Sequence, residues 1–139
     1  MNTPPELELV SFVQNDDLVG LKAVIDERID LYSKGDFSAD DITLDTCKLV
    51  TAMKVIEDRI KLIEGRYVLW NKERKNRKEE DLRNAKMLFA TLHGFYKVML
   101  YSRELAWAKA KGVEFTDGQH TAILIFNLYN DEALGIHQN

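Results

Sequence analysis

Histidine, the side chain that most often binds metals or transfers protons near neutral pH, occurs three times, at His93, His120 and His137. No two of them are three or four positions apart, the spacing that would place two imidazoles on one face of a helix. Di-iron helical proteins use Glu-x-x-His pairs, but of the residues three positions before these histidines only Asp117 is acidic. We therefore expect no metal centre and no cofactor.

A second candidate for metal chemistry is an acidic cluster of Asp40, Asp41 and Asp45. Two carboxylates four positions apart on a helix could hold Mg²⁺ through water. Helical enzymes that use such clusters for diphosphate chemistry need further acids on a facing helix, and the acidic pairs at 27/30 and 57/58 do not clearly match that requirement. Because acids also stabilise the first turn of a helix, we interpret the cluster as a helix start.

Nucleophilic chemistry has little support. The only cysteine, Cys47, cannot form an internal disulfide, and its apolar and polar helix-forming neighbours indicate a small core residue. No serine or threonine lies on a Gly-flanked elbow, and no Gly-rich phosphate loop is present. We predict that the protein is not an enzyme.

The charges are segregated along the chain, with a net charge of −4. Residues 1–60 and 113–139 are acidic, whereas residues 61–112 carry an excess of basic side chains. Such segregation is typical either of a nucleic-acid surface or of protein surfaces that dock by charge complementarity. We favour docking, because the acidic ends outweigh the basic centre.

The basic side chains are concentrated around 72–86, where they could contact phosphates while Trp70 or Tyr67 stacks on a base. The candidate phosphate contacts are Lys72, Arg74, Lys75, Arg77, Lys78, Arg83 and Lys86. Acids interrupt the same run at Glu73 and at 79–81, which weakens the local field. Nucleic-acid binding through this basic elbow is therefore the alternative function.

The elements that must position these residues are predicted to be helices. Apolar residues in steps of four and three run through Leu49, Met53, Ile56, Ile60, Ile63, Tyr67 and Trp70, the period of a helix packed along a partner. Since an interior glycine costs only about 1 kcal/mol, Gly65 should weaken this helix rather than end it. We predict a long antiparallel hairpin of helices at about 39–75 and 77–111, with its turn near Asn76.

The expected hairpin core is formed by two sets of side chains that face each other: Met53, Ile56, Ile60 and Ile63 against Phe89, Leu92, Tyr96 and Met99. The segment 71–81 has no apolar side chain, so it is either the turn or an exposed helical spacer. The second long helix should end at Gly112.

Shorter helices complete the prediction. One is expected at about 4–14, with prolines in its first turn, and another at about 17–34, ended by Gly35. A fifth is expected beyond Thr116; its apolar run 122–126 could also be a strand, but no second strand candidate exists to pair with it. The predicted fold is an all-α bundle of about five helices in a single domain, 1–139.

The helix at 77–111 has more apolar surface than one neighbour can cover. The candidate interface residues are Trp70, Leu88, Phe95, Val98, Tyr101 and Trp107. We therefore expect a non-catalytic protein–protein interaction protein, an adaptor, inhibitor or assembly subunit, that acts through apolar helix faces and self-associates as a dimer. A compact five-helix monomer is the alternative.

No apolar run approaches the roughly 18 residues that cross a bilayer, and the first residues lack the features of a signal peptide. We expect a soluble cytoplasmic protein with no membrane partner.

Overall fold

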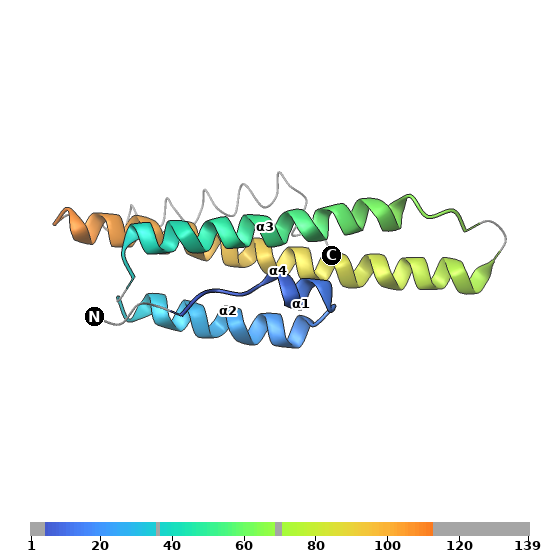
Figure 1. Cartoon of the computed structure of the whole chain (residues 1–139), viewed down its shortest axis with the longest axis horizontal. Coiled ribbons are helices and arrows are strands. Elements are labelled where there is room, and N and C mark those ends of the chain that lie inside the picture. Colours follow the sequence, from blue (N-terminus) through green and yellow to red (C-terminus); the bar gives the residue numbers. More distant parts are fainter. Residues whose placement is uncertain (1–4, 36, 69–70, 113–139) are drawn as a thin grey trace.

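The computed structural model describes residues 5–35, 37–68 and 71–112, and every regular element within them is an α-helix. In chain order these are α1 (Val10–Gln14), α2 (Leu18–Ser33), α3 (Ala39–Glu64) and α4 (Lys72–Ala110) (Figure 1). The all-α prediction is confirmed. Four helices rather than about five lie in this part of the chain, and the fifth predicted helix, beyond Thr116, falls outside it. None of the described helices is long and apolar enough to traverse a bilayer.

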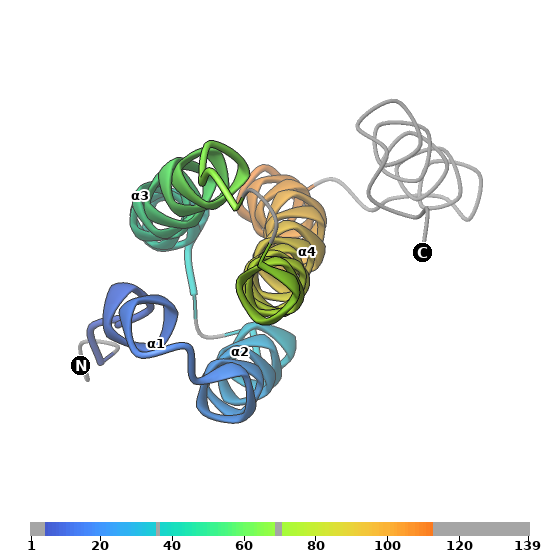
Figure 2. The ribbon, with the colours of Figure 1, turned by 90° about the vertical axis from the view of Figure 1, so that its right-hand side faces the viewer.

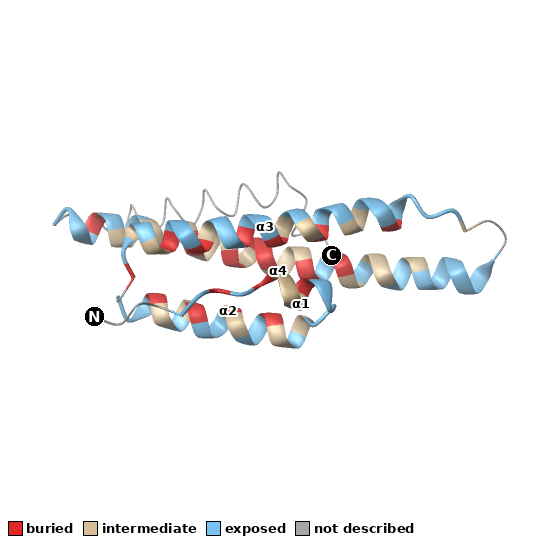
Figure 3. Ribbon diagram, viewed as in Figure 1, coloured by how far each residue is buried: buried red, intermediate tan, exposed pale blue. Residues whose placement is uncertain are grey.

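The two long helices α3 and α4 lie side by side and run in opposite directions, and the shorter α1 and α2 cover one side of the pair (Figures 1 and 2). A polar contact also joins α3 and α4, because Thr46 Oγ1 lies 3.7 Å from Met99 Sδ. Just beyond the end of α3, Arg66 donates to Asp81 of α4 at 2.6 Å. Buried residues line the inner face of α3 from Ile42 to Ile63 and that of α4 from Ala85 to Ala108, whereas the first turns of α4 are largely exposed (Figure 3). The largest fully buried side chains of the two long helices are Ile42, Leu49, Ile56, Ile63, Leu88, Leu92, Phe95 and Met99.

The end of α3 corrects one prediction. The helix stops at Glu64 and does not continue to residue 75, so Gly65 ends it rather than weakening it. A helix end leaves backbone carbonyls without intrahelical partners. Lys78 of α4 supplies one, because its Nζ donates to the backbone oxygens of Glu64 and Arg66 at 3.1 and 3.0 Å. This tertiary contact stabilises the early stop.

The predicted turn near Asn76 is also wrong, because α4 has already begun at Lys72. The connection lies before Asn71, whose side chain caps α4 by accepting a hydrogen bond from the Arg74 amide at 3.0 Å. Residues 72–81 are therefore the exposed helical spacer that was the alternative to a turn. Lysine, arginine and glutamate favour helix without any burial, which explains why this apolar-free stretch is helical.

These boundaries predict opposite effects for two asparagines. Replacing Asn71 with alanine removes the cap of α4 and should lower the free energy of unfolding by about 1 kcal/mol. Replacing Asn76 with alanine, inside α4, should leave it unchanged or raise it by up to about 0.5 kcal/mol, because alanine is the better helix former. Urea unfolding of the two variants checks this. A larger decrease in the free energy of unfolding for Asn76→Ala than for Asn71→Ala would show that the turn lies at residue 76.

The N-terminal segment also differs from the prediction, because the helix expected at 4–14 begins only at Val10. Residues 5–9 are not helical, and both Leu7 and Leu9 are buried. Side chains two positions apart share a face in extended chain but point to different faces of a helix. Burying both leucines therefore favours the extended conformation.

The remaining boundaries agree closely with the sequence. Residues 18–33 form α2, whose N-cap Asp17 accepts a hydrogen bond from the Gly20 amide, and Gly35 follows it with a φ of +76°. At the start of α3, Ser38 and Asp41 form a capping box, consistent with the interpretation of this acidic cluster as a helix start. The positive φ of Gly35 is a left-handed conformation, which glycine adopts readily because it has no Cβ.

Candidate functional site

Arg28 of α2 and Asp45 of α3 form a buried ion pair. The Arg28 Nε donates to Asp45 Oδ2, and Nη2 donates to Oδ1, each at 2.7 Å, so the guanidinium binds both carboxylate oxygens. Its Nη1 donates to the backbone oxygen of Pro5 at 2.6 Å. Only 7% of each side chain is exposed. One arginine thus joins α2, α3 and the N-terminal segment.

Two aromatic residues complete what we call the Arg28 cluster: Arg28, Tyr32, Phe37 and Asp45. The Tyr32 hydroxyl donates to Asp45 Oδ2 at 2.5 Å. The Phe37 ring lies under the Arg28 guanidinium, with Cζ 4.7 Å from the ring centroid, and packs edge-on against Tyr32. Tyr32 also stacks on Phe95, which links the cluster to α4. The hydrogen bonds of Arg28 and Asp45 therefore connect α2, α3 and the N-terminal segment.

The environment of the cluster shifts two pKa values. Burial raises the pKa of Tyr32 above its ordinary value, and its hydrogen bond to the Asp45 carboxylate raises it further. For Arg28, burial by itself lowers the pKa, but the hydrogen bond and charge of Asp45 raise it overall. Neither residue is poised to exchange a proton near neutral pH, so the cluster is suited to structure rather than to acid–base catalysis.

The raised pKa of Tyr32 gives an alkaline pH dependence. In the unfolded chain Tyr32 ionises near pH 10, whereas in the folded chain it stays neutral to higher pH. Stability due to this shift is complete below about pH 10 and decreases as the pH rises further. Relative to Tyr32→Phe, the wild-type chain should lose about 1 kcal/mol of unfolding free energy between about pH 9 and pH 11. Urea unfolding at both pH values tests this, and equal losses in the two proteins would contradict it.

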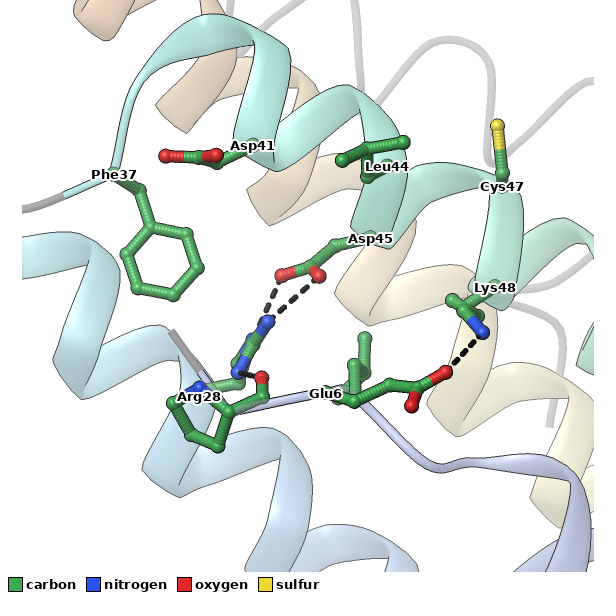
Figure 4. A pocket seen from close by; sticks show the side chains of 10 residues that line it. Glu6, Arg28, Phe37, Asp41, Leu44, Asp45, Cys47 and Lys48 are labelled. Carbon is green, nitrogen blue, oxygen red and sulfur yellow. Dashed lines mark hydrogen bonds and ion pairs between the residues drawn. The ribbon is translucent and has the colours of Figure 1, made fainter. Parts of the chain in front are cut away.

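Beside the Arg28 cluster lies a hollow of about 330 Å³ between the N-terminal segment and α3 (Figure 4). Apolar side chains contribute to its lining, namely Leu7, Phe37 and Leu44. An ion pair between Lys48 Nζ and Glu6 Oε1, 2.6 Å long, lies at its edge. The volume is at the small end for a small-molecule site and suits an inserted apolar side chain.

The outer surface of α3 carries a largely uncharged strip next to this hollow. We call it the α3 face and define it as Asp40, Thr43, Leu44, Cys47, Val50, Thr51 and Lys54, all placed within about a third of the helix circumference by the 100° step per residue. Leu44 is 67% exposed and Val50 is 52% exposed, although both are apolar. Cys47 lies between them, and it points away from the Arg28 cluster (Figure 4).

A second hollow borders the same strip on the side of α4. It is lined by Ala39, Asp40, Thr43, Arg103, Glu104 and Trp107. Trp107 is 51% exposed, so a large aromatic side chain stands beside the first turns of α3. Exposed aromatic residues are enriched at protein interfaces.

The structure divides the candidate interface residues. Leu88 and Phe95 are in the core, 1% and 2% exposed, and this corrects their assignment to an exposed surface. They lie on the side of α4 that packs against the other helices, which the sequence could not separate from its wide apolar stripe. Val98 and Tyr101 are half-buried and Trp107 is exposed, whereas Trp70 lies outside the described residues.

Most of the candidate phosphate contacts are exposed on the first half of α4: Lys72, Arg74, Lys75, Arg77, Arg83 and Lys86. Lys78 is half-buried and binds the end of α3. By the helical step, Lys72, Lys75, Arg83 and Lys86 share one face, but Glu79 lies among them. The structure thus brings four of the seven together with an acid in their midst.

The residues considered for chemistry are dispersed. Asp40 and Asp41 lie in the first turn of α3, as interpreted, while Asp45 is bound to Arg28. Within residues 5–35, 37–68 and 71–112, no three His, Cys, Asp or Glu side chains gather as metal ligands do. His93 is buried; its ring stacks with Phe89 and lies tilted against Tyr96. His120 and His137 lie outside the described residues.

Cys47 is exposed, which corrects its interpretation as a core residue. It lies two positions before Leu49, and such a step turns a helical side chain to the opposite side.

The Arg28 cluster is the feature that the sequence interpretation missed. A signal for it was present: Asp45 lies in step with Ile42, Leu49 and Ala52, and all four are buried. Arg28 likewise lies in the stripe of Leu21, Ile25 and Tyr32. Opposite charges inside two apolar stripes predict a buried pair, since an isolated buried charge is costly.

The chain matches no model of a known protein family, no curated protein and no solved structure. Its function must therefore be argued from its own geometry.

Proposed function

We propose that this chain is a non-catalytic protein that works by binding other protein chains, as an adaptor, inhibitor or assembly subunit. The observation that supports this most directly is the α3 face, where the apolar side chains of Leu44 and Val50 are exposed on the two edges of the strip, with the uncharged Thr43, Cys47 and Thr51 between them. Soluble proteins bury most large apolar side chains, so two exposed ones on a strip with no charge between them favour an interaction surface. The hollows on both flanks of the face give a partner's side chains places to insert.

The packing beneath the face supports the same function. The Arg28 cluster fixes the first turns of α3 to α2 and to the N-terminal segment through Asp45 and Pro5. A surface on a rigid helix loses little conformational entropy when a partner binds, which favours affinity. The role of the cluster is therefore to position the binding surface.

Site-specific photo-crosslinking in the source cells tests this proposal. A photoreactive phenylalanine analogue at Leu44 should form discrete adducts with a protein partner, and Leu44→Glu variants carrying the same group at Val50 should not. The matched control is the same analogue at Lys22, an exposed position on α2. If position 44 gave no adduct beyond those of position 22, the α3 face would not be a binding surface.

Nucleic-acid binding through residues 72–86 remains the alternative, and the shared face of Lys72, Lys75, Arg83 and Lys86 favours it. Glu79 on that face and the structural use of Lys78 weigh against it. Salt separates the two functions, because phosphate contacts weaken steeply as salt is added whereas apolar contacts do not. Oligonucleotide binding that persists at physiological salt and is lost on charge reversal of Arg83 and Lys86 would favour the alternative.

A further inference from the structure

The α3 face is symmetrical about its central residue. Counted outward from Cys47, Leu44 and Val50 are each three positions away, and Thr43 and Thr51 are each four positions away. Asp40 and Lys54 are each seven positions away, two turns of helix, and carry opposite charges. Every member of the face therefore has a counterpart on the other side of Cys47.

This symmetry matches the geometry of a two-fold axis. When two copies of a helix pack antiparallel with the same residue at the crossing point, residues equally distant from that point lie opposite each other. With Cys47 at the crossing, Leu44 of one copy lies opposite Val50 of the other, and Thr43 opposite Thr51. Asp40 then lies opposite Lys54 at each end of the contact. We propose that the partner of the α3 face is a second copy of this chain, bound antiparallel across Cys47; this inference rests on the proposed function.

The polar groups of the face are compatible with burial. The Thr43 hydroxyl donates to the backbone oxygen of Ala39 at 2.9 Å, and the Thr51 hydroxyl donates to that of Cys47 at 3.0 Å. Both hydroxyl protons are therefore already bonded within α3, and a partner would not have to replace a lost bond to water. Of the charges at the two ends, Lys54 already pairs with Asp58 on its own helix at 2.9 Å, and the antiparallel arrangement gives it a second acid, Asp40 of the other copy, while supplying Asp40 with a base.

Among the described helices, the position of α3 leaves its outer side open to a second copy. Viewed end-on, α3 occupies a corner of the helix arrangement, with α4 on one side and α1 on another (Figure 2). Pairing through α4 is less favourable, because its first half would bring Lys72, Lys75, Arg83 and Lys86 of two copies together. The α3 face instead pairs unlike charges. A contact limited to a few turns of one helix lies at the small end of specific interfaces, so we expect a reversible dimer.

Sedimentation equilibrium on the full chain tests this inference. The wild-type protein should show a mass that rises from one to two chains with concentration, whereas Val50→Glu should remain monomeric. Lys54→Glu should weaken association about tenfold or more, because like charges then meet twice across the axis. The double variant Asp40→Lys/Lys54→Glu inverts both pairs and should restore association. The control Lys22→Glu makes the same charge change on α2 and should associate like the wild type.

Crosslinking through Cys47 tests the antiparallel arrangement independently. A short bis-maleimide should join two chains through their Cys47 thiols in the wild type and in the double variant, but not in Val50→Glu, where the cysteine is equally exposed. Circular dichroism of each variant verifies that it is folded.

A wild-type protein that is monomeric at all concentrations overturns the proposal, as does a dimer that neither Val50→Glu nor Lys54→Glu weakens. If the chain is monomeric but the photoreactive group at Leu44 still captures a different protein, the second copy is wrong and the protein-binding function stands. If both experiments fail, both proposals are wrong.

Discussion

Replacing Asp45 with alanine should lower the free energy of unfolding by about 3–5 kcal/mol, the usual cost of removing one partner from a buried ion pair. The carboxylate accepts two hydrogen bonds from Arg28 and one from Tyr32. Without it, the guanidinium remains buried with its charge uncompensated. Since small domains are stable by only about 5–15 kcal/mol, the variant should unfold at a much lower urea concentration.

Two further variants separate the ion pair from a general effect of losing an acid. Asp58→Ala, which removes an exposed pair with Lys54 on the same helix, should leave the urea midpoint nearly unchanged. The double variant Arg28→Met/Asp45→Leu should be more stable than Asp45→Ala alone, because apolar residues of similar size can replace a buried ion pair. A double variant less stable than the single one would show that the charge of Arg28 is tolerated without Asp45.

The second large effect is expected in the core between α3 and α4. Ile56 and Leu92 are both 0% exposed, so alanine at either position leaves a cavity in a close-packed interior. Each substitution should cost about 2–5 kcal/mol of unfolding free energy. Ile60 and Phe89, expected from the sequence to be equally central, are only partly buried, so alanine there should cost less.

The control for the core is Leu62, which lies on α3 between Ile60 and Ile63 but is 75% exposed. Leu62→Ala should change the unfolding free energy by no more than about 0.5 kcal/mol. Thermal or urea unfolding of the variants ranks the positions. If Leu62→Ala proved as costly as Ile56→Ala, the inner face of α3 would be wrongly assigned.

Much of the local structure follows from the sequence. The cap at Asp17, the capping box of Ser38 and Asp41, and the glycines 35 and 112 set helix boundaries close to those observed. These signals act within one or two turns, so they depend only on neighbouring residues. The apolar periodicity likewise predicted the helices at 18–33 and 39–64, because it reflects the helical repeat itself, but it did not mark where the second of them ends.

Other features depend on residues far apart in the chain. Gly65 ends α3 where Lys78 of α4 binds the last carbonyls, and a local propensity of about 1 kcal/mol could not decide this. Leu7 and Leu9 favour extended chain only because both can be buried against the helices.

The candidate site shows the same division. The symmetrical spacing around Cys47 is written in the sequence, but only the packed structure exposes Leu44 and Val50 while burying Leu88 and Phe95. Periodicity gives the relative direction of side chains on a helix, whereas exposure depends on which directions the neighbouring helices occupy. The pairing of Arg28 with Asp45 is likewise decided by tertiary structure, because residues 17 positions apart on two helices come within hydrogen-bonding distance only when those helices pack together.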